Sequence, residues 1–116
     1  MSWLKLEKRD SNYDPHKRVE SFVQRYGEEG RRVLDAFNSV DPLHVLIDED
    51  TNPDEYLGYC TRFFHNLGIR ALGDLSRQEL VGLVTSCFHA SQIGKFVQVA
   101  DIKQIADLIF TAAKQR

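Results

Sequence analysis

Apolar residues recur along the chain at the spacing of an amphipathic helix, whereas the strict alternation of a half-buried strand is nearly absent. A first helix is predicted to begin at Asp14, whose carboxylate suits an N-cap, with Pro15 at the first helical position. Gly27 supplies its stop signal. The apolar face of this helix consists of Val19, Phe22, Val23 and Tyr26.

A second helix is predicted from about Glu29 to Val40. It ends before Asp41-Pro42, because the residue preceding a proline is disfavoured in the α region. Residues 43–47 are too few to fix a period and fit either a short helical turn or a strand-like segment. Of the two we favour a short helix capped by Asp41. The inward face of the second helix consists of Val33, Leu34 and Phe37.

The best-marked helix start lies near residue 52. Asn52 as N-cap, Pro53 at the first position and Glu55 at the third form a start that resembles a capping box. The acidic side chains there also complement the positive end of a helix dipole. Gly68 ends the helix. Its buried face is expected to hold Tyr56, Cys60, Phe63, Phe64 and Leu67.

Two further helices are predicted in the last third of the chain. Ser76 and Glu79 form a second capping box, which opens a helix with Leu80, Leu83, Val84, Cys87 and Phe88 inward. The last helix is predicted to be capped by Asp101, with Gln104 three positions later, although a start several residues earlier also fits. Its inward residues are Ile102, Ile105, Ala106, Ile109 and Ala112 or Ala113.

These elements predict an all-α fold, a compact bundle of five to six short helices with short connections. Residues 14–116 are expected to form a single helical domain. Residues 1–13 are an N-terminal segment that either packs on this bundle through Trp3, Leu4 and Leu6 or stays loosely ordered.

The composition agrees with an ordinary globular domain, since 42% of the 116 residues are apolar and 28% are charged. No apolar run approaches the roughly 18 residues that a membrane-spanning helix requires, and the N-terminus lacks the order of a secretory signal. We therefore expect a cytoplasmic protein without a membrane segment. Cys60 and Cys87 imply no disulfide framework, because each lies in an apolar helical pattern that typically buries a small thiol.

Metal sites find little support in the sequence. Asp48, Asp50 and Asn52 occupy the first, third and fifth positions of a calcium-loop pattern. Pro53 and Tyr59, however, replace the glycine and the glutamate that the loop needs at its sixth and twelfth positions. The cysteines and histidines lack the paired spacing of a zinc site. We expect neither a metal nor another cofactor.

Catalysis and nucleic-acid binding are also not expected. Both cysteines share a helix face with apolar side chains, which raises a thiol's pKa, and no glycine-rich phosphate loop or nucleophile elbow is present. We therefore expect a protein that is not an enzyme. Residues 1–34 carry eight Lys or Arg, but six acidic residues among them offset most of that charge. A mixed, solvated face explains this pattern better than direct nucleic-acid binding.

Charge is distributed unevenly along the chain, although the net charge is only −2. Residues 35–58 contain seven acidic residues and no lysine or arginine. We call residues 48–55 the acidic segment, because five carboxylates lie within it: Asp48, Glu49, Asp50, Asp54 and Glu55. They serve either to solvate a loop and favour a helix start, or to steer a basic partner by long-range potential.

Several short motifs together resemble a known class of protein. They are Asp41-Pro42-Leu43, the acidic segment, Asp54-Glu55-Tyr56 at a helix start, Glu79-Leu80 and Phe88. Small bacterial immunity proteins of contact-dependent inhibition and related polymorphic toxin systems are similar in size, acidic patches and helical make-up. The resemblance covers roughly residues 33–89. The sequence departs from that pattern at two places. His44 stands where a small residue is usual, and Leu57-Gly58 follow the tyrosine where the pattern has an acidic residue.

The resemblance implies a non-enzymatic protein that binds and neutralises a cognate toxin domain. Many such toxins are nucleases with basic clefts, so the carboxylates would stand where phosphates stand. Tyr56 or Tyr59 would be an aromatic anchor, although helical spacing favours Tyr56 in the core. The expected partner-binding residues are Asp48, Glu49, Asp50, Asp54, Glu55 and Tyr59. The alternative is a helical adaptor or regulatory subunit that binds a protein partner through an apolar groove between helices.

Overall fold

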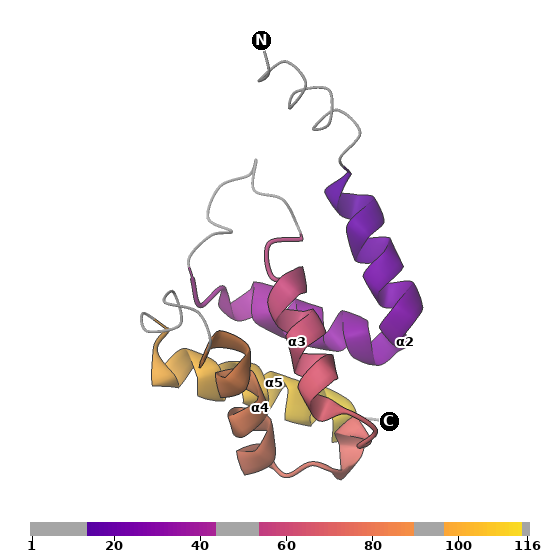
Figure 1. Ribbon diagram of the computed structural model, residues 1–116. Coiled ribbons are helices and arrows are strands. Elements are labelled where there is room, and N and C mark those ends of the chain that lie inside the picture. Colours follow the sequence, from indigo (N-terminus) through magenta and orange to yellow (C-terminus); the bar gives the residue numbers. More distant parts are fainter. Residues whose placement is uncertain (1–13, 44–53, 90–96, 115–116) are drawn as a thin grey trace.

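The computed structural model describes residues 14–43, 54–89 and 97–114 (Figure 1). Within these ranges the chain is all-α, as predicted. The elements are α2 (Pro15–Val40), α3 (Leu57–Leu67), the 3-10 helix η1 (Leu72–Asp74), α4 (Arg77–His89) and α5 (Val99–Lys114). The described ranges thus hold four α-helices, fewer than the five to six expected. None of them is long and apolar enough to cross a membrane.

Helix α2 combines the first two predicted helices. Its N-cap is Asp14, which accepts hydrogen bonds from the backbone N–H groups of His16 and Lys17 at 3.0 and 3.3 Å. Gly27 interrupts the helical geometry with φ 69° and ψ −154°, a conformation that essentially only glycine adopts. The helix changes direction there and continues to Val40 (Figure 1). The predicted stop at Gly27 is therefore a sharp bend between two helical halves.

The end of α2 agrees with the prediction, whereas the start of α3 does not. Asp41 follows the last helical residue in the left-handed region, at φ 50°, and its N–H donates to the Phe37 carbonyl at 2.8 Å. Residues 54–56 form a turn, and α3 begins only at Leu57. The prediction of a helix opening at Pro53 was therefore wrong, because Asp54 and Tyr56 direct their side chains to partners outside α3. Asn52, Pro53 and residues 44–47 lie outside the described residues.

The capping box of α4 is confirmed in both directions. The Ser76 N–H donates to the Glu79 carboxylate at 2.9 Å, and the Glu79 N–H donates to Ser76 Oγ at 3.1 Å. Hydrogen bonding from Ser76 lowers the pKa of Glu79. Helix α5 begins two residues before the cap predicted at Asp101, with the Gln98 carbonyl accepting the Asp101 and Ile102 N–H groups at 3.1 and 3.2 Å.

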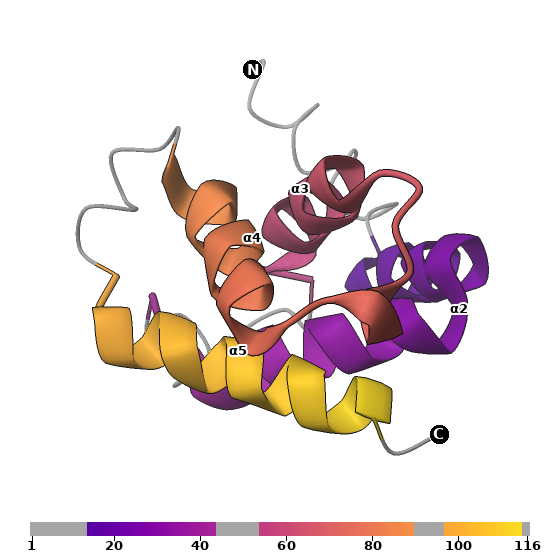
Figure 2. The same ribbon diagram turned by 90° about the horizontal axis from the view of Figure 1, so that it is seen from below.

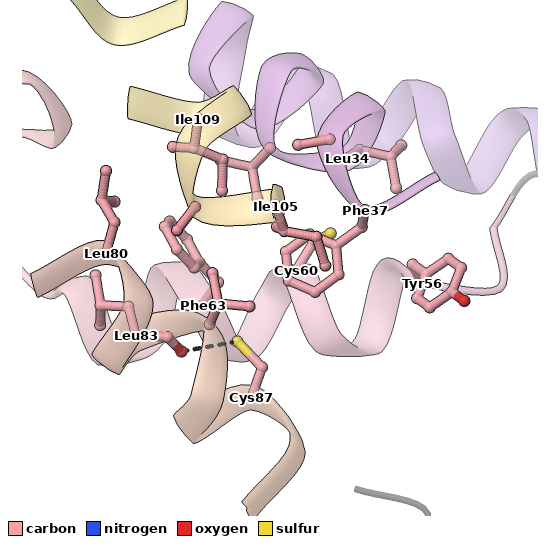
Figure 3. Packing of buried hydrophobic residues seen from close by; sticks show 14 of the residues in the cluster. Leu34, Phe37, Tyr56, Cys60, Phe63, Leu80, Leu83, Cys87, Ile105 and Ile109 are labelled. Atoms are coloured by element: carbon pink, nitrogen blue, oxygen red, sulfur yellow. Dashed lines mark hydrogen bonds between the residues drawn. The ribbon is translucent and has the colours of Figure 1, made fainter. Parts of the chain in front are cut away.

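The four helices enclose a single core (Figures 2 and 3). Helix α5 packs against α2 and α4, and α3 packs against the same two helices. The predicted inward faces supply most of the buried side chains. Those that are fully buried include Phe37, Phe63, Leu80, Ile105 and Ile109. The half of α2 that precedes Gly27 contributes Phe22 to this core and lies near the start of α3, and its first turns extend beyond the other helices (Figure 1). This arrangement sets the frame of the candidate site.

Candidate functional site

Three of the six predicted partner-binding residues lie in the described part of the chain. Asp48, Glu49 and Asp50 lie outside it. Asp54, Glu55 and Tyr59 are placed by the turn before α3 and by the first part of that helix.

Asp54 is a buried residue of the fold. Its side chain is 3% exposed, and its Oδ2 accepts a hydrogen bond from Arg18 Nη1 at 2.9 Å. The Asp54 carbonyl also accepts the Leu57 N–H at 3.1 Å, which closes the turn that leads into α3. Arg18 lies in the first half of α2, so this ion pair ties that half to the end of the acidic segment. Asp54 therefore presents no carboxylate surface to a partner.

Tyr56 connects the two sides of the acidic segment. Its side chain is fully buried, and its hydroxyl donates to Asp41 Oδ1 at 2.6 Å while accepting the Leu43 N–H at 2.9 Å. Burial, and next the hydrogen bond to Asp41, raise the pKa of Tyr56 far above its ordinary value. The phenol therefore stays neutral and holds Leu43, which precedes the acidic segment, close to the start of α3. The core position that helical spacing favoured for Tyr56 is confirmed.

Glu55 and Tyr59 remain accessible. Glu55 is exposed, whereas Tyr59 is half-buried. The centroid of the Tyr59 ring lies 4.8 Å from that of Phe88 and 6.0 Å from that of Tyr56. A ring packed on one side and open on another has the amphipathic placement common at interfaces. The structure thus leaves one carboxylate and one aromatic ring of the predicted set available in the described ranges.

A basic groove that the sequence reasoning missed runs between the first half of α2 and the start of α3. It has a volume of about 630 Å³, and Lys17, Arg18 and Arg25 line it together with Tyr26 and Thr61. The three cations had been interpreted as part of a mixed, solvated face. A signal was present, because Lys17, Ser21 and Arg25 recur every four residues and therefore share one side of a helix.

The two cysteines pack inside the core and are free thiols. The Cys87 S–H donates to the Leu83 carbonyl at 3.3 Å (Figure 3), and burial raises the pKa of Cys87 to about 12. Burial also raises the pKa of Cys60 well above its ordinary value. Their predicted packing role is confirmed, since a protonated, enclosed thiol is a poor nucleophile and a poor metal ligand.

Within residues 14–43, 54–89 and 97–114, no three His, Cys, Asp or Glu side chains converge as a metal site would need. The residues of the calcium-loop pattern at 48, 50 and 52 lie outside these ranges. Comparisons with protein families, curated proteins and solved structures found no match to this chain, so its function is argued from geometry and charge.

Proposed function

We propose that this chain is a non-catalytic, immunity-type protein that binds a cognate toxin domain through the acidic segment and blocks the toxin's basic cleft. The segment would supply carboxylates where the toxin's substrate supplies phosphates. Glu55 and Tyr59 would extend the contact onto the start of α3.

One observation carries the proposal: both flanks of the stretch that holds Asp48, Glu49 and Asp50 are fastened to the fold. On one side the Tyr56 hydroxyl binds the Leu43 N–H, and on the other Arg18 binds the Asp54 carboxylate. Fixing the two ends of a charged segment lowers the conformational entropy that binding must overcome. Carboxylates clustered in such a segment would speed encounter with a cationic partner.

The proposal predicts that a toxin domain is encoded beside the gene for this chain, and the experiment produces that domain together with the chain in a bacterial host; absence of such a toxin gene would refute the proposal. Cells that make the wild-type chain are expected to survive. Cells that make the triple variant Asp48→Lys, Asp50→Lys and Glu55→Lys are expected to die, with the variant's melting temperature within a few degrees of wild type.

A matched control reverses three exposed acidic residues elsewhere, Glu20→Lys, Glu28→Lys and Asp107→Lys, and so changes the net charge equally. It is expected to protect as well as wild type. Equal protection by the acidic-segment variant and by this control would refute the proposal.

A further inference from the structure

We propose that the basic groove between α2 and α3 is a second interaction surface, which binds an acidic peptide segment of a partner protein. The proposal is independent of the toxin hypothesis, because the groove is lined by residues 14–26 and 57–61, and the described part of the acidic segment touches it only through Asp54, which is already bound to Arg18. It requires a ligand that is negatively charged, extended and partly apolar.

The spacing of the cations fits an extended peptide. Lys17 and Arg25 lie eight residues apart on one side of a helix, which places them about 12 Å apart along its axis. A peptide strand rises about 3.3 Å per residue and alternates its side chains between two faces, so carboxylates four positions apart share a face and would reach both cations. Neither cation forms an ion pair within the described ranges.

The groove already holds one carboxylate at its edge. Arg18 is part of the lining, and it binds Asp54 at 2.9 Å while its own side chain stays 55% exposed. The ion pair between Arg18 and Asp54 is therefore the same type of contact that the partner's acidic side chains would make with Lys17 and Arg25. On a protein of net charge −2, this face presents the opposite sign.

The floor favours a peptide over a single-stranded nucleic acid. Phe22 and Leu57 lie beneath the groove and are only 6% and 4% exposed, whereas nothing lies within 4 Å of a Cβ built on Gly58, so an apolar side chain of the peptide has room beside Gly58. A nucleobase needs an open aromatic face. The Tyr26 ring is stacked on Phe64 at 4.5 Å, and the Arg25 guanidinium lies over it at 5.5 Å.

The test measures fluorescence anisotropy of a fluorescein-labelled peptide in which two aspartates, four positions apart, flank a leucine. The full chain is expected to bind it, more weakly as ionic strength rises. The double variant Lys17→Glu and Arg25→Glu is expected to lose about tenfold or more in affinity, since two attractive contacts become repulsive. The matched variant Arg31→Glu and Lys103→Glu, which reverses exposed cations elsewhere, is expected to bind as wild type does.

A steric pair distinguishes the groove from general charge. Gly58→Trp is expected to abolish binding, whereas Gly58→Ala is expected to leave it unchanged, with circular dichroism reporting the fold of each variant. Three results would overturn the proposal: equal binding of an asparagine version of the peptide, tighter binding of an oligo-dT strand, or a salt-sensitive dimer that the Lys17 and Arg25 reversals abolish. The last would identify a second copy of this chain as the occupant.

Discussion

The phenol of Tyr56 lies 2.6 Å from the carboxylate of Asp41, fifteen positions earlier in the sequence, and this hydrogen bond joins the end of α2 to the start of α3. The same oxygen accepts the Leu43 N–H. One buried side chain therefore closes the base of the stretch that contains the acidic segment. Tyr56 would thus serve the proposed function indirectly, by holding the two ends of this stretch together, and would not itself contact the partner.

Replacing Tyr56 with Phe is expected to lower the free energy of unfolding by about 1–3 kcal/mol, because it leaves the Leu43 N–H and the Asp41 carboxylate without this partner. Urea denaturation measures the change. Tyr59→Phe is the control, since this half-buried ring packs on Phe88, and its effect is expected to stay within about 0.5 kcal/mol. Equal stabilities of the two variants would contradict the bridging role.

The raised pKa of Tyr56 also predicts a pH dependence. A tyrosine whose pKa is raised in the folded state contributes stability below its unfolded pKa, about 10, and loses that contribution as pH rises further. Wild-type unfolding free energy is therefore expected to fall more steeply above about pH 10 than that of Tyr56→Phe. Parallel pH profiles would show that the phenol is not held neutral by folding.

The sequence predicted the helices well where the signals were local. The Ser76–Glu79 capping box and the Asp14 N-cap appear as expected, because each involves side chains and N–H groups within one turn. The start of α3 was mispredicted because Asp54 and Tyr56 form contacts 36 and 15 positions away, with Arg18 and Asp41. Tertiary contacts override propensity there, and no local pattern reveals them.

The candidate site shows the same division. Charge counting found the acidic segment but gave Asp54 the same role as Glu55, although one is buried and the other exposed. It also missed the basic groove, because acidic neighbours in the sequence, such as Glu20, offset Lys17 and Arg25. In the structure the groove lining contains the cations and Asp14 but not Glu20.

Substitution of Gly27 tests the bend in α2. Gly27→Ala is expected to destabilise the fold by about 1–3 kcal/mol, since φ 69° with ψ −154° strains any residue with a Cβ. Gly82→Ala is the control, because Gly82 lies inside α4 and a Cβ added there meets open space. Alanine at this position is expected to raise the free energy of unfolding by about 0.5–1 kcal/mol. Stabilisation by both alanines would show that α2 tolerates a straight path.

The buried thiols predict a distinctive reactivity. Cys60 and Cys87 are expected to resist a thiol-specific disulfide reagent in the native protein near pH 8 and to react at once in concentrated guanidinium chloride, because both are enclosed and protonated.

Burial of Cys87 also predicts a pH dependence of stability, because it raises the pKa of this thiol from 9.0 in the unfolded chain to about 12 in the folded protein. The contribution of Cys87 to the free energy of unfolding is therefore full below pH 9 and is lost as the pH rises toward 12. Cys87→Ala is expected to flatten the stability profile in that range, and an unchanged profile would contradict the assignment.

Asp54 and Glu55 are adjacent in the sequence but are expected to respond oppositely to loss of charge. Asp54→Asn is expected to cost about 1–3 kcal/mol of stability, since it weakens the pairing of a buried carboxylate with Arg18, whereas Glu55→Gln is expected to change stability by less than about 0.5 kcal/mol. Glu55→Gln is instead expected to slow toxin association at low salt, where exposed charge acts over the longest distance. Thermal denaturation and stopped-flow binding separate the two effects. If Glu55→Gln left the association rate unchanged while Asp54→Asn slowed it at equal stability, the buried carboxylate would be the steering group, and the division argued from their exposure would be wrong.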